Sequence, residues 1–98
     1  MYNNIMTTQN LYTLSDTTAT RITPAGTHSG VDITIQNIND SGYIYVGTED
    51  VTSTAFGYRL LPNHAWSIEL PGRDDLWIIA ETNGMEAAVL TTSLEQQD

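Results

Sequence analysis

The sequence contains no cysteine and no lysine, and only three prolines occur among its 98 residues. The absence of cysteine excludes disulfides, thiolate metal sites, iron–sulfur clusters and thiol catalysis. No apolar run is long enough for a transmembrane helix or for the hydrophobic region of a secretory signal. A chain of this length has room for one hydrophobic core, so we expect a single domain.

Positive charge is also scarce. Three arginines stand against twelve Asp and Glu residues, which gives a formal net charge of −9 at pH 7. An acidic surface of this kind repels phosphate backbones and anionic lipid headgroups, so we expect neither nucleic acid nor membrane among the partners. With 40% hydrophobic and 15% charged residues, the composition is typical of a folded chain rather than a disordered one.

Short segments of strand-like composition recur along the chain. In segment 31–36 the apolar residues Val31, Ile33 and Ile35 alternate with polar residues, which predicts a strand with one buried face. Segment 76–80 is apolar throughout and predicts a strand that is buried on both faces. The other segments of strand character are 19–23, 43–47, 58–61, 66–70 and 87–92.

Turn-forming residues separate these segments at intervals of about 8–12 residues. We expect residues 39–42 to form a tight hairpin turn between segments 31–36 and 43–47. The pattern predicts an all-β fold, a small antiparallel β-sandwich or barrel of seven to eight strands, paired mostly in sequential order. The residues expected in its core are Ile33, Ile35, Ile44, Val46, Leu60, Trp66, Ile68, Leu70, Leu76, Ile78 and Val89.

The first residues of the chain differ from this pattern, because their apolar positions follow neither a helical nor a strand period. We expect residues 1–18 to form an extended N-terminal arm, 19–94 a single β-sandwich domain and 95–98 a frayed tail. The arm carries one charged side chain, Asp16, and so can approach an acidic subunit with little repulsion. It either adds a strand to a neighbour's sheet or is a disordered leader without a role. Its candidate contact residues are Tyr2, Ile5, Met6, Leu11, Tyr12 and Leu14.

The sequence shows no motif for catalysis or metal binding. His28 and His64 lie far apart in expected turns, without the spacing of a metal-ligating pair. No Gly-x-Ser-x-Gly context surrounds a candidate nucleophile. The acidic pairs at 49–50 and 74–75 lack the alternating spacing of a calcium-binding loop. We therefore expect no enzyme, no metal site and no cofactor.

Tyrosines offer an alternative binding chemistry. Tyr43 and Tyr45 share one face of their expected strand, and Tyr58 stands in the next expected strand. If the three rings are exposed together, they form a strip that can contact a partner subunit or stack on sugar rings, as in a carbohydrate-binding module. If they are not, they form a rim of the core with their hydroxyls in water.

Short phrases that combine turn residues with strand phase recur between Val31 and Leu90. They are Gln36-Asn37-Ile38-Asn39, Tyr43-Ile44-Tyr45-Val46-Gly47, Val51-Thr52-Ser53-Thr54, Gly57-Tyr58-Arg59-Leu60, Leu70-Pro71-Gly72 and Leu76. In this order the phrases resemble a small β domain that is common among the virion proteins of tailed bacteriophages. The chain departs from that family's pattern at Thr48 and Asn63, where glycine is usual. Asparagine tolerates a positive φ, so we expect the turn at Asn63 to be kept.

This resemblance implies a non-enzymatic structural protein of a tailed-phage virion. The first expectation is a capsid decoration protein on the outer surface of the head, bound to the major capsid protein or to other virion subunits. The alternatives are a tail, fibre or head–tail joining component and, outside the virion, the carbohydrate-binding module. Because a small sandwich has sheet edges to cover, we also expect a homo-oligomer, with a trimer as the first choice, a dimer as the second and a monomer as the third.

Overall fold

Eight β-strands and no helix make up the described part of this computed structural model, which comprises residues 2–23, 30–70 and 75–97. At residues 2–6 and 93–97 only the backbone is described. The all-β prediction is confirmed. The strands are β1 (Tyr2–Thr13), β2 (Thr20–Arg21), β3 (Val31–Asn37), β4 (Ile44–Gly47), β5 (Tyr58–Leu60), β6 (Ala65–Leu70), β7 (Trp77–Ala80) and β8 (Glu86–Gln97).

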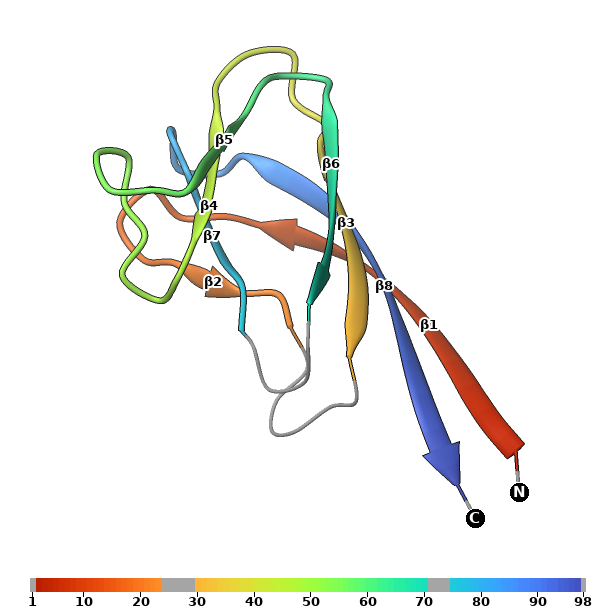
Figure 1. Cartoon of the computed structure of the whole chain (residues 1–98). Helices are drawn as coiled ribbons and strands as arrows, with labels where there is room; N and C mark the ends of the chain where they lie inside the picture. The colour runs from red at the N-terminus through yellow and green to blue at the C-terminus, as the bar shows by residue number, and fades with distance from the viewer. Residues whose placement is uncertain (1, 24–29, 71–74, 98) are drawn as a thin grey trace.

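The chain forms one long antiparallel hairpin that is rolled into two sheets. β1 pairs with β8, β2 with β7, β3 with β6 and β4 with β5, and all four pairs are antiparallel. Two further pairs, β3 with β8 and β4 with β7, complete sheet I, of order β1-β8-β3-β6, and sheet II, of order β2-β7-β4-β5 (Figure 1). This nested connectivity is that of a jelly roll, one form of antiparallel sandwich.

Two expectations about strand pairing are wrong. The hairpin expected at residues 39–42 does not form, because β3 lies in sheet I and β4 in sheet II. Pairing is not mostly sequential either, since β4 and β5 are the only described strands that pair with a sequence neighbour. Turn residues predict a reversal of the chain, and a crossing between two sheets needs such a reversal as much as a hairpin does.

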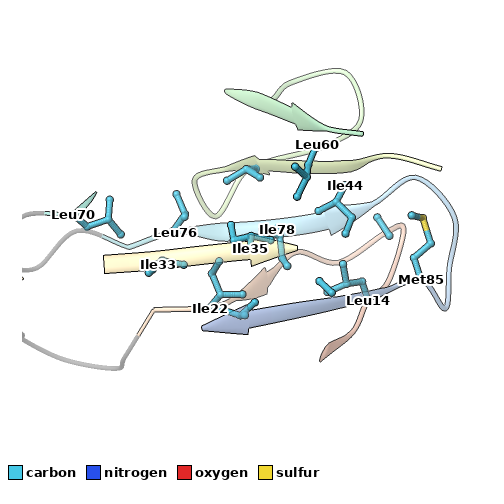
Figure 2. Packing of buried hydrophobic residues seen from close by; sticks show 14 of the residues in the cluster. Leu14, Ile22, Ile33, Ile35, Ile44, Leu60, Leu70, Leu76, Ile78 and Met85 are labelled. Atoms are coloured by element: carbon cyan, nitrogen blue, oxygen red, sulfur yellow. The ribbon is translucent and has the colours of Figure 1, made fainter. Parts of the chain in front are cut away.

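The hydrophobic core lies between the two sheets, as Figure 2 shows. Ile35 of sheet I belongs to the same cluster as Ile44 and Ile78 of sheet II, and none of the three side chains is accessible to solvent. Every residue expected in the core belongs to this cluster, with Trp66 and Ile68 as partly buried members. Alternation along the strands therefore predicted the buried face correctly.

β7 is buried on both faces, as its apolar sequence predicted. Ile78 faces the core, whereas Ile79 packs with Tyr45 and Val51 on the outer face of sheet II. Val51 comes from loop 48–57, so this loop covers part of that face. Sheet II thus has a second, small hydrophobic cluster outside the main core.

The N-terminal segment takes part in the sandwich. β1 pairs with β8 without a break from Tyr2 opposite Gln97 to Thr13 opposite Glu86. Leu14, which follows β1, is only 2% exposed and belongs to the core, so its assignment as an interface residue is wrong. Among the side chains of this segment that the structure describes, Tyr12 of β1 and Leu14 just after it pack in the core, and this short apolar pattern does not reveal a strand.

β1 and β8 also continue past the rest of sheet I. The pairing of β3 with β8 ends at Ser93, so the described strand beside Leu94–Gln97 is Tyr2–Ile5 of β1 alone. Figure 1 shows these red and blue strand ends extending together away from the sandwich.

Candidate interaction surface

The histidines and acidic residues within the described ranges form no cluster suited to a metal ion. In the part of the chain that the structure describes, no group of three or more His, Asp and Glu side chains could hold a metal ion. His64 is exposed, with its Nδ1 atom 2.8 Å from the carbonyl oxygen of Pro62, and His28 lies outside the described residues. Among the described residues there is also no helix long and apolar enough to cross a membrane.

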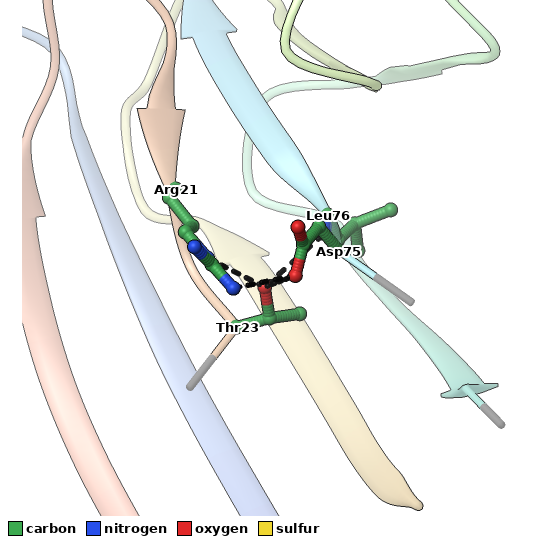
Figure 3. Close-up of polar contacts among 4 residues, drawn as sticks. All are labelled: Arg21, Thr23, Asp75 and Leu76. Atoms are coloured by element: carbon green, nitrogen blue, oxygen red, sulfur yellow. Dashed lines mark hydrogen bonds and ion pairs between the residues drawn. The ribbon is translucent and has the colours of Figure 1, made fainter. Parts of the chain in front are cut away.

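Asp75, one member of an acidic pair, has a structural role (Figure 3). Arg21 Nη2 donates a hydrogen bond to Asp75 Oδ1 at 2.6 Å, and the Thr23 hydroxyl donates to the same oxygen at 3.3 Å. Thr23 Oγ1 also accepts a hydrogen bond from the backbone N–H of Leu76 at 3.3 Å. The group connects the end of β2 to the start of β7 and contributes to the fold.

This group gives a first prediction about stability. Thr23 is buried, so Thr23→Val leaves the N–H of Leu76 without its acceptor and is expected to lower the free energy of unfolding by about 1–3 kcal/mol. Asp75→Asn is expected to cost less than about 1 kcal/mol, because solvent screens a partly exposed ion pair. Urea unfolding followed by tryptophan fluorescence measures both changes. Thr23→Ser keeps the hydroxyl and serves as the control; an equal loss in Thr23→Ser and Thr23→Val would contradict the role of this hydrogen bond.

The tyrosines do not form the exposed strip that the sequence suggested. Tyr43 and Tyr45 meet edge to face on sheet II, with their ring centroids 6.4 Å apart. Tyr45 is only 7% exposed, because loop 48–57 places Phe56 against it at 4.8 Å between ring centroids. Of the two alternatives for the tyrosines, exposure is therefore wrong for Tyr45. The Arg59 guanidinium lies over the Tyr43 ring, 4.6 Å from its centroid.

Tyr58 has a different neighbour. Its ring stacks on Trp66 at 4.8 Å between centroids, which connects β5 of sheet II to β6 of sheet I. The three tyrosines thus provide no continuous platform on which a sugar ring could stack. The side chains of Tyr2, Ile5 and Met6 lie outside the described residues.

The two asparagines of the phrase Gln36-Asn37-Ile38-Asn39 form hydrogen bonds that stabilise the fold. Asn37 is fully buried, and its Nδ2 donates to the carbonyls of Gly42 and Leu60 at 3.0 and 3.1 Å. Its Oδ1 accepts hydrogen bonds from the backbone N–H and from Nδ2 of Asn39, at 3.1 and 2.8 Å. Asn39 also exchanges two hydrogen bonds with the backbone of Glu86. This network holds the β3–β4 connection against β5 and β8.

Asn63 confirms the expectation made for its turn. It is the one residue other than glycine with a positive φ in the described part of the chain, at 58°. Asparagine adopts this left-handed conformation more readily than other non-glycine residues, so it can replace the usual glycine.

The outer face of sheet I carries an open surface without charge. We call it the neutral face; it consists of two rows of outward side chains that cross all four strands. The strand registers give the rows as Leu11, Ala88, Gln36 and Ala65, and then Gln9, Leu90, Thr34 and Ser67. Charge appears on both sides of the neutral face: Asp32 lies opposite Glu69 in the row beyond Thr34, and the exposed Glu86 lies opposite Thr13 in the row beyond Leu11.

Two leucines give the neutral face its apolar character. Leu11 is 62% exposed and Leu90 is 46% exposed, and both line a shallow hollow of about 440 Å³. Sequence reasoning selected Leu11 but missed Leu90. The available signal was the phase of segment 87–92, in which Leu90 stands opposite to the inward-facing Val89.

Comparison with models of known protein families and with curated proteins found no match for this chain.

Proposed function

We propose that this chain is a non-enzymatic structural protein of a tailed-phage virion, a decoration protein that docks on the outer surface of the head through the neutral face. The observation that supports this proposal is the distribution of charge. The chain has a formal net charge of −9, yet the eight positions of the neutral face carry no charged residue. The cores of protein–protein interfaces are depleted of charge in the same way.

The neutral face also offers apolar surface to a partner. Burial of the exposed parts of Leu11 and Leu90 would contribute roughly 1–2 kcal/mol each. Gln9, Thr34 and Gln36 stand beside them and supply hydrogen-bonding groups. A protein docked in this way exposes its acidic surface to water. There the acidic side chains favour solubility and are not in contact with the packaged DNA.

The resemblance of the phrases between Val31 and Leu90 to virion β domains supports the assignment to a phage particle. The jelly-roll connectivity agrees with it by analogy, since this fold is used in viral capsids. Lectin domains use the same fold, so the fold by itself does not separate a decoration protein from a carbohydrate-binding module. The buried Tyr45 and the separated Tyr58 favour the decoration protein.

Composition of purified particles tests this proposal. Mass spectrometry of particles produced by the genome that encodes the chain should find the protein in heads, in a fixed ratio to the major capsid protein. Absence from particles would overturn the proposal, and recovery from tails alone would assign the protein to the tail. Binding to a glycan array that is lost in Tyr43→Ala would instead favour the carbohydrate-binding module.

A matched pair of variants tests the docking face. Leu90→Glu is expected to weaken binding to heads that lack the protein by at least about tenfold, because it places a charge at the centre of the interface. Leu61→Glu is the control, since Leu61 is 44% exposed against 46% for Leu90 but lies on the β5–β6 turn. Co-sedimentation with purified heads measures both affinities. Equal losses would show that the neutral face is not the docking surface.

A further inference from the structure

Among the described strands, β1 is an edge strand of sheet I whose sequence lacks the usual protection against further pairing. Its 12 residues contain no charged residue, no proline and no glycine. Natural edge strands are usually short, charged or interrupted, because their free N–H and C=O groups can pair with another chain.

The other three edges have such protection. In sheet I the opposite edge, β6, carries the charge of Glu69. In sheet II the edge strands β2 and β5 have two and three residues, and each contains an arginine. β1 is therefore the exception among the described strands.

The free hydrogen-bonding groups of β1 can be assigned to particular residues. The backbone N–H of Leu14 donates to Met85 at 2.8 Å, and the carbonyl of Leu14 accepts from Gly84 at 2.9 Å, so both groups point toward the β8 side. Backbone groups alternate between the two sides of a strand, and the register of β1 has no break. The N–H and C=O groups of Thr7, Gln9 and Leu11 consequently point away from β8.

We infer that two copies of this chain pair through their β1 strands, antiparallel about a two-fold axis, so that their two copies of sheet I form one continuous sheet. This pairing does not depend on the particle to which the protein belongs. It differs from the trimer expected from the sequence.

Charge favours a second copy at this edge. Two subunits of formal charge −9 repel each other wherever their acidic surfaces meet, but a strand pair formed by β1 introduces no charged side chain. An antiparallel two-fold pair is also self-complementary, because each free donor of one strand meets a free acceptor of the other.

The ends of β1 and β8 supply a second reason. Tyr2–Ile5 and Leu94–Gln97 form a two-stranded ribbon past the end of the β3 pairing, and a ribbon of two strands has marginal stability alone. Antiparallel pairing places the last residues of the partner's β1 beside the first residues of this one. Each ribbon then gains a third strand, which is the end of the partner's β1. The partner's β8 pairs with that strand on its other side.

The mass of the full chain in solution tests the inference. Light scattering coupled to size exclusion, with loading over about 10–100 µM, should give twice the mass of the chain. Gln9→Pro removes an N–H that points away from β8. An edge strand tolerates proline at such a position, so this variant is expected to give a folded monomer. Ser67→Pro is the matched control and should leave the dimer intact. The Asn37 N–H donates to the His64 carbonyl, so alternation along the paired strands directs the Ser67 N–H outward from β6.

Circular dichroism shows whether the proline variants fold. A second pair of variants, which contain no proline, tests the inference if they do not. Gln9→Glu places like charges across the two-fold axis and is expected to weaken the dimer at least about tenfold, with partial recovery in high salt. Ala65→Glu adds the same charge at the opposite edge and should have no such effect. A monomer or a trimer of the unmodified chain would overturn the inference, as would a dimer that persists in both Gln9 variants.

Discussion

Leu14→Ala is expected to lower the free energy of unfolding by about 2–5 kcal/mol. The Leu14 side chain is 2% exposed and packs in the main core, at the point where the chain leaves β1. Backbone hydrogen bonds to Met85 and Gly84 hold this residue in place, so the surroundings can close only part of the cavity that alanine leaves. Urea denaturation followed by tryptophan fluorescence gives the change.

Leu11→Ala is the control for this prediction, because it makes the same substitution three residues earlier. Leu11 is 62% exposed, so we expect a change within about 0.5 kcal/mol. A detached N-terminal arm would make both substitutions neutral, and that result would contradict the role of the segment in the sandwich. Deletion of residues 1–14 removes β1 together with Leu14 and is expected to prevent stable folding.

Asn37→Ala is expected to cost about 3–5 kcal/mol, because it removes a buried amide that joins three parts of the chain. The carbonyls of Gly42 and Leu60 lose their donor, and Asn39 loses its acceptor. Each buried polar group left without a partner costs about 1–3 kcal/mol. Thermal and urea unfolding measure the loss.

Two further variants make this prediction specific. Asn83→Ala changes an exposed asparagine and should shift stability by less than about 0.5 kcal/mol. Asn37→Asp keeps the shape of the side chain but directs a carboxylate oxygen at the two carbonyls. Its loss of stability, relative to the unmodified protein, should be smaller in acid than at neutral pH, because protonation restores a donor. A loss as small as that of Asn83→Ala would contradict the role of the Asn37 network.

The strands and their buried faces could be predicted because alternation is a local property. Successive side chains of a strand point to opposite faces. Ile33 and Ile35 therefore face the core and their polar neighbours do not, whichever strand lies beside them. Pairing is not local. The partner of β1 lies at the opposite end of the chain, and no pattern within residues 2–13 indicates β8.

The exposure of side chains outside the core depends on loops as well as on strand phase. Tyr45 was expected to face a partner, but loop 48–57 covers it with Val51 and Phe56. Leu90 was missed because its role depends on its place beside Gln9 and Thr34, which only the assembled sheet provides. A surface built from four strands cannot be read from any one of them.

The nested hairpin also has a consequence for the order of folding. The β4–β5 pair closes only loop 48–57, whereas the β1–β8 pair closes residues 14–85. This difference is roughly three doublings of loop length, so closing the outer pair first costs about 2 kcal/mol more chain entropy. Folding that starts at the β4–β5 tip and proceeds toward the chain ends avoids this cost. β1 then joins after the main barrier, so a weakened Leu14 contact accelerates unfolding more than it slows refolding.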